Sequence, residues 1–116
     1  MSSNIFAVLR ARGPAWNDAA AMEEQVDWRG HADFMNQLVS EGVILLGGPL
    51  SGTRDVLLIF RAGNEAEVDA RLAADCWTVN GLLRTVRIDP WSLRLGSLDP
   101  STELRASPSA TLRAGP

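Results

Sequence analysis

The chain has 116 residues, of which 46% are hydrophobic and 22% are charged, values typical of one globular domain and unlike those of a disordered chain. Its net charge of -3 argues against a nucleic-acid partner, and no apolar run approaches the roughly 20 residues of a membrane-spanning helix. One cysteine cannot form an internal disulfide. We therefore expect a cytoplasmic protein that binds neither nucleic acid nor a membrane.

The first elements predicted along the chain are a strand and a helix. The short apolar run Ile5–Arg10 is rich in β-forming residues and ends before Gly13-Pro14, so it predicts a strand. Asp18 is expected to cap the following helix, whose periodicity is clearest over Trp28–Glu41. Gly42 is the expected C-terminal stop.

The middle of the chain predicts a hairpin and a second helix. Val43–Leu46 is a second strand, and Gly47-Gly48-Pro49 after it predicts a turn or loop. The run Asp55–Arg61 predicts a third strand. Asn64 then caps a helix expected to run from Glu65 to about Asp75.

The last predicted elements complete a β-α-β-β-α-β order. Residues 78–81 form a turn or short helix, Leu83–Asp89 form a fourth strand, and Pro90 stops it. This order favours an α+β fold of the ferredoxin-like type, with a four-stranded antiparallel sheet and two helices on one face. Its first and third strands lie in the middle of the sheet. We assign residues 1–97 to this domain and residues 98–116, rich in Ser, Ala and Pro, to a flexible tail.

The two central strands predict a partner subunit. Both Ile5–Arg10 and Asp55–Arg61 carry apolar side chains at alternate and at intervening positions, so both faces of the sheet are apolar. Two helices cover only one face. A homodimer packed sheet to sheet, or a larger homo-oligomer, would cover the other.

His31 is the single imidazole of the chain, and it lies on the apolar side of the first long helix. Trp28 precedes it by three residues, and Phe34 and Met35 follow it by three and four, so all of them face the sheet. An imidazole there needs either a hydrogen-bond partner or a wet pocket. Both a structural histidine bonded to a backbone carbonyl and a catalytic one fit this position.

Asp75 is the second candidate, at the end of the second helix. One of its oxygens can cap the short helical segment that follows, and the other can orient an imidazole, so the structural and the catalytic roles are compatible.

Four segments resemble the YCII-related (YciI-like) family. They are Trp28-x-x-His31-x-x-Phe34-Met35, Leu46-Gly47-Gly48-Pro49-Leu50, Ala74-Asp75-Cys76-Trp77 and Pro90-Trp91. Together they span roughly residues 5–96, in order and at plausible spacing. The resemblance implies a dimeric α+β barrel, in agreement with the strand and helix order above.

The resemblance also implies a catalytic dyad formed by His31 and Asp75. The chain departs from the family pattern of Asp-Pro-aromatic, because Cys76 stands at the position of the proline. This loses the rigidity that proline gives to a first helical residue but removes no reactive group. We expect Cys76 to be a small packing residue rather than a nucleophile, and we leave a Cys76–His31 pair open.

Four further residues are expected to bind a small-molecule ligand. Gly48 and Pro49 belong to a segment that lacks the Lys and the following helix of a phosphate loop, so we expect a hairpin loop lining the pocket. Trp77 and Trp28, close in sequence to the two dyad residues, are expected to wall the same pocket.

The remaining charged residues give less information about function. Arg10, Arg84 and Arg87 are read as solvated strand ends, of which one could meet an anionic ligand. One His and one Asp offer too few ligands for a metal, and nothing else supports haem, so we expect no metal and no cofactor. The absence of Lys excludes Schiff-base chemistry.

Two functions remain in view. The first is a small cofactor-free enzyme that performs an isomerisation or elimination on an aromatic or lactone-like metabolite, a substrate class that the resemblance implies. The alternative is a non-catalytic dimer that binds a small ligand or has a structural role. Catalysis requires His31 and Asp75 to lie within about 3 Å or one water of each other beside an open cavity, whereas a filled pocket favours the alternative.

Overall fold

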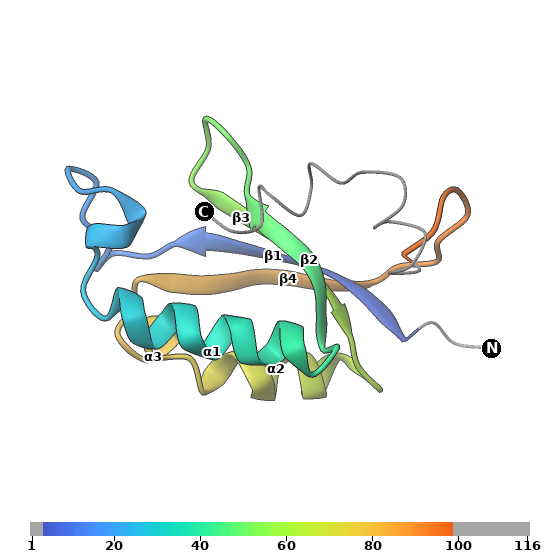
Figure 1. The fold of residues 1–116 in the computed structure, drawn as a ribbon. Helices are drawn as coiled ribbons and strands as arrows, with labels where there is room; N and C mark the ends of the chain where they lie inside the picture. Colours follow the sequence, from blue (N-terminus) through green and yellow to red (C-terminus); the bar gives the residue numbers. More distant parts are fainter. Residues whose placement is uncertain (1–3, 99–116) are drawn as a thin grey trace.

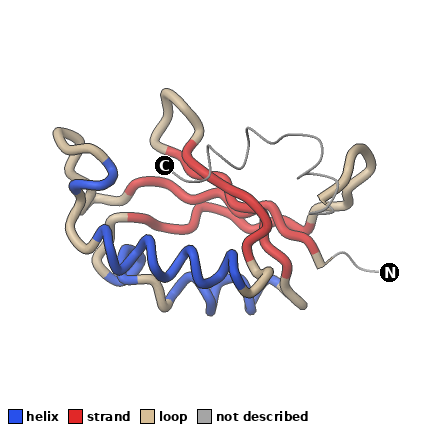
Figure 2. Tube along the Cα trace, viewed as in Figure 1, coloured by secondary structure: helices blue, strands red, loops and turns tan. Residues whose placement is uncertain are grey.

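Within residues 4–98, a four-stranded antiparallel sheet carries helices on one face only (Figure 1; Figure 2). The computed structural model describes residues 4–98. The elements are β1 (Ile5–Arg12), the 3-10 helix η1 (Met22–Glu24), α1 (Trp28–Ser40), β2 (Ile44–Pro49), β3 (Asp55–Arg61), α2 (Glu65–Ala73), α3 (Cys76–Val79) and β4 (Leu83–Pro90). The strand order β2-β3-β1-β4 places β1 and β3 in the centre, as predicted, and the ferredoxin-like α+β fold is confirmed.

The main core lies between the central strands and the two long helices. Phe6 and Val8 of β1 pair with Phe60 and Leu58 of β3, and all four side chains are buried. Because side chains alternate along a strand, these four share the helix-covered face. The helices and β2 complete the core with Leu38, Ile44, Val68 and Leu72.

The edge strand β4 contains an irregularity that keeps its apolar residues on the helix side. Leu83 pairs with Arg12 and Ile88 pairs with Val8, although Ile88 lies five positions after Leu83 in the chain. An odd separation would place the two on opposite faces of a regular strand. The register shift beside Leu9 inserts one extra residue, Val86, and so returns both side chains to the same face.

The opposite face of the sheet has no helix over it in residues 4–98 (Figure 1). Ile5, Ala7 and Leu9 of β1 point to this side together with Leu57 of β3, and all four are half-buried. Leu46 of the edge strand β2 adjoins them and is 43% exposed. The predicted apolar character of both faces is therefore present.

The predicted start of the first helix at Asp18 is wrong. Residues 13–27 form a loop containing only the short η1, and α1 begins at Trp28. The buried side chain of Gln25 explains the difference, because its amide accepts from the backbone N–H of Asn17 and donates to the carbonyls of Asn17 and Ala20. These bonds satisfy the loop backbone in place of helical hydrogen bonds.

The prediction that Gly47-Gly48-Pro49 forms a turn or loop is also wrong, since these residues continue β2. Gly47 pairs with Leu58, and a Cβ added to it would lie 2.6 Å from Leu58 Cδ2 and 2.9 Å from the carbonyl oxygen of Leu57. A glycine therefore fits this close approach of two strands. Pro49 is tolerated because β2 is an edge strand.

The second helix begins as predicted and ends two residues earlier than expected. Asn64 caps α2, with its side chain accepting from the backbone N–H of Glu67 at 2.8 Å. The helix ends at Ala73 because Asp75 caps α3 instead. Except for Leu98, the predicted tail 98–116 lies outside the described residues. No helix among residues 4–98 is long and apolar enough to cross a membrane.

Candidate active site

His31 and Asp75 lie side by side at the junction of α1 and α3. Nδ1 of His31 is 2.8 Å from Oδ2 of Asp75, and both residues are buried. The other carboxylate oxygen of Asp75, Oδ1, accepts a hydrogen bond from the backbone N–H of Trp77 at 3.3 Å and so caps α3. One carboxylate therefore both caps α3 and contacts the imidazole.

The backbone around Asp27 fixes the place of the imidazole. Asp27 has a φ of 60°, a left-handed conformation that Asp tolerates better than most residues, and it precedes the first residue of α1. Its carbonyl accepts the backbone N–H of His31, and its carboxylate accepts from Asn80 at 2.7 Å. The indole N–H of Trp77 donates to the carbonyl of Val26 at 2.7 Å. These bonds hold the start of α1 against α3.

Aromatic rings fix the orientation of His31. Its imidazole stacks on the indole of Trp77, with ring centres 3.8 Å apart and planes 7° from parallel. Trp28 lies 6.1 Å from His31 and 5.8 Å from Trp77, and Trp16 meets Trp77 edge-on at 5.3 Å. With the ring plane held by Trp77 and Nδ1 engaged by Asp75, Nε2 is the ring nitrogen available to a bound molecule.

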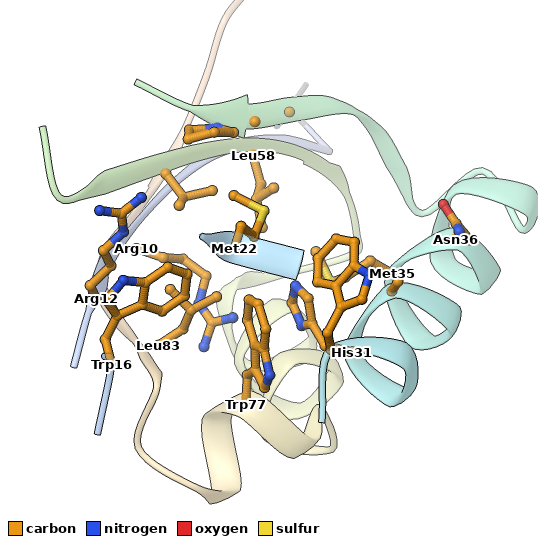
Figure 3. A pocket seen from close by; sticks show the side chains of 16 residues that line it. Arg10, Arg12, Trp16, Met22, His31, Met35, Asn36, Leu58, Trp77 and Leu83 are labelled. Carbon is orange, nitrogen blue, oxygen red and sulfur yellow. The ribbon is translucent and has the colours of Figure 1, made fainter. Parts of the chain in front are cut away.

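A cavity of about 300 Å³ opens beside His31, where β1 and β2 end and β3 and β4 begin (Figure 3). It is lined by five of the six residues that the sequence suggested for the site, namely Trp28, His31, Gly48, Pro49 and Trp77. The sixth, Asp75, lies behind His31 and outside the lining. The volume is at the lower end of the range for ligand sites and suits a single-ring molecule.

Arg10 is a site residue whose surroundings the sequence analysis misjudged. It is fully buried rather than solvated, and it lines the cavity. Its Nη2 donates to Oγ1 of Thr78 at 2.7 Å, and its Nη1 lies 3.7 Å from Oδ2 of Asp75. Burial lowers the pKa of the Arg10 guanidinium, and the nearby Asp75 carboxylate raises that pKa in part. The alternation of side chains along β1 could have predicted this burial, because Arg10 points to the same face as Phe6 and Val8.

Three further lining residues were not proposed as site residues from the sequence, although Met35 was placed on the sheet-facing side of its helix. Arg12 lies two residues beyond Arg10 on the same strand face, and its guanidinium packs 4.5 Å from the centre of the Trp16 ring. Met35 and Asn36 line the cavity one turn of α1 beyond His31. Strand alternation and helical spacing could have found all three, once β1 was extended to Arg12.

Cys76 packs away from the cavity. Its Sγ lies 3.7 Å from the carbonyl oxygen of Asp27, so the Cys76–His31 pair left open by the sequence does not form. Burial, with the Asp75 and Asp27 carboxylates adding to it, raises the pKa of the Cys76 thiol and favours its unreactive protonated form. Within residues 4–98, no group of three or more His, Cys, Asp or Glu side chains is placed to hold a metal.

Comparisons with known proteins agree on the family and the fold. The YCII-related domain matches residues 7–92, a range that contains every site residue named above. No curated protein matches the sequence. Among solved structures, 5-chloro-2-hydroxyhydroquinone dehydrochlorinase (TftG) from Burkholderia phenoliruptrix, in complex with 2,5-dihydroxybenzoquinone, matches with a TM-score of 0.59 and 22% identity. The match covers 78% of this chain and 95% of that one, and it shows a shared fold.

Proposed function

The chain belongs to the YCII-related family, and on that premise we propose that it is a small enzyme that needs no cofactor and uses His31 and Asp75 for acid–base chemistry. Its reaction is an isomerisation or an elimination on a small aromatic or lactone-like metabolite. The observation that carries the proposal is the 2.8 Å contact between the two side chains beside an open cavity. This is the geometry that a general base and its orienting carboxylate require.

In the proposed mechanism, Nε2 of His31 accepts a proton from a C–H or O–H bond of the substrate. The electron pair of that bond forms a new double bond. In an elimination the leaving group departs with its own bonding pair, and the imidazolium then loses its proton to solvent. In an isomerisation the pair of the original double bond takes the proton back from the imidazolium at another carbon. Asp75 holds the proton on Nδ1 and stabilises the imidazolium that forms.

The walls of the cavity favour a flat substrate. Three indoles, Trp16, Trp28 and Trp77, line it and offer faces and edges on which a ring can stack. The structurally similar TftG is a dehydrochlorinase, an elimination enzyme with a hydroquinone substrate, and was solved with a quinone bound. We take a ring of this size as the first substrate class to test.

The proposal includes a homodimer formed through the helix-free face of the sheet. Apolar residues of β1 and β3, such as Leu9 and Leu57, point to this face, and Leu46 beside them is exposed. Burying such a surface against a second copy is favourable. A cytoplasmic location remains a prediction from composition.

The first test is chloride release from 5-chloro-2-hydroxyhydroquinone, run beside the isomerisation of an unsaturated lactone. We expect turnover of one of them, and His31→Gln should lower kcat by about 10²- to 10⁴-fold, the usual contribution of a positioned general base. Arg84→Gln, an exposed change on β4 that does not line the cavity, is the matched control and should keep full activity.

Two results would count against the enzyme. If His31→Gln retained wild-type turnover, the imidazole would not be the base. If the wild-type protein bound these compounds without converting any of them, the non-catalytic ligand-binding alternative would replace the enzyme.

A further inference from the structure

Arg10 brings a positive charge into the protein with too few hydrogen-bond acceptors around it. A guanidinium has five N–H donors. In the described part of the chain, Nη2 bonds to Thr78, whereas Nε and Nη1 are buried and have no hydrogen-bond partner. Buried donors are normally paired, so the under-satisfied guanidinium of a residue that lines the cavity favours an oxyanion there, attracted chiefly by the charge because Nε and Nη1 themselves are shielded.

Asp75 does not supply this acceptor. Its Oδ2 is 2.8 Å from His31 but 3.7 Å from Nη1 of Arg10, beyond hydrogen-bond distance. Its Oδ1 is occupied by the backbone N–H of Trp77. The carboxylate therefore balances part of the charge of Arg10 electrostatically and leaves its donors unpaired.

Arg12 adds a second positive charge at the same cavity. It is half-buried and stacked on Trp16, and among residues 4–98 no carboxylate lies within salt-bridge distance of it. No Asp or Glu of the described residues lines the cavity. Two arginines therefore meet at a cavity whose lining, in the described part of the chain, holds no carboxylate, although Asp75 and Asp69 act on Arg10 electrostatically from outside it. An anionic ligand would complement these two positive charges.

We propose that the cavity binds a planar anion: a single ring bearing a carboxylate or an ionised hydroxyl, with its oxygen at Arg10 and Arg12 and its ring against the indoles. This inference rests on the proposed function and specifies its substrate class. A planar oxyanion matches the fork of N–H donors on a guanidinium. The same arginines would stabilise the negative charge that spreads onto the oxygen when His31 removes a proton.

The test compares benzoate with benzamide, which has the same shape without the charge. Binding is followed by the fluorescence of the tryptophans that line the cavity and by calorimetry. We expect benzoate to bind at least about tenfold more tightly than benzamide, a difference typical of a charge-assisted pair. Arg12→Gln should reduce this preference to about threefold or less, while the exposed Arg84→Gln should keep it.

Arg10→Met is a second variant, to be read only where circular dichroism shows a folded protein, and it should also remove the preference. The wild-type comparison of the two probes does not depend on any variant folding. Equal affinities, or no binding of benzoate at all, would overturn the anion site. If the protein preferred benzoate but converted no substrate, the proposed enzyme activity would be wrong and the anion site would stand. If it converted substrate without preferring benzoate, the anion site would be wrong and the enzyme activity would stand.

Discussion

At the scale of single residues, the neutral imidazole of His31 can carry its proton on either ring nitrogen, and Asp75 decides which. A carboxylate only accepts hydrogen bonds, so the 2.8 Å contact at Nδ1 requires the proton there and leaves Nε2 free to act as a base. An enzyme with the proton on Nε2 would present a donor to its substrate and could not begin the proposed reaction.

This predicts a change of tautomer in Asp75→Asn. The amide that replaces the carboxylate can donate to Nδ1, so we expect the share of the Nε2–H form to rise several-fold. Nitrogen-15 NMR measures the two forms, and His31 is the single histidine, so its signals need no assignment. Asp33→Asn, an exposed carboxylate two residues along α1, is the control and should leave the tautomer unchanged. If the wild type, Asp75→Asn and Asp33→Asn all showed the same tautomer, Asp75 would not be the residue that orients the imidazole.

At the scale of secondary-structure elements, apolar runs and capping residues were sufficient to predict most of the fold. The apolar run of β3 and the cap at Asn64 are local properties, and both elements begin where the sequence places them. The loop over residues 13–27 is held by contacts of Gln25 with backbone up to eight residues away, which no local pattern reports. The burial of Arg10 was missed for a related reason. An arginine near a strand end is usually solvated, whereas this one is buried and bonds to Thr78 of α3, a residue distant in the sequence.

In β2, the packing requires a glycine at position 47 but leaves room for a larger residue at position 48. A methyl group on Gly47 would meet both Leu58 Cδ2 and the Leu57 carbonyl below 3 Å, whereas one on Gly48 has no heavy atom within 4 Å. Gly47→Ala should therefore lower the free energy of unfolding by about 1–3 kcal/mol, the usual cost of overpacking. Gly48→Ala should stay within about 0.5 kcal/mol of the parent.

Urea unfolding followed by tryptophan fluorescence compares these two variants directly. Equal stabilities would mean that β2 can shift away from β3 at this point, and the cavity wall that Gly47 and Gly48 share would then be adjustable.

At the scale of the whole molecule, the two faces of the sheet have different surroundings. One face packs against α1 and α2, whose inward residues Leu38, Val68 and Leu72 are buried. The other carries aliphatic side chains of β1 and β3, half-buried at Leu9 and Leu57 and buried at Ile59, with no helix among residues 4–98 over them (Figure 2). A surface of this kind on a small domain favours association, and two-fold symmetry would bring the same face of each copy together.

The predicted dimer can be tested by placing a charge on that face. Leu46→Arg exchanges an exposed side chain, so the monomer should still fold, but a symmetric interface would then hold two like charges without partners. We expect the wild-type protein to sediment at twice the 12.5 kDa of one chain, and the dissociation constant of the variant to rise roughly tenfold or more. Val39→Arg is the matched control, because Val39 is 51% exposed on α1, away from that face, and it should remain dimeric. A wild-type monomer, or equal dissociation constants for the two variants, would show that the helix-free face is not the interface.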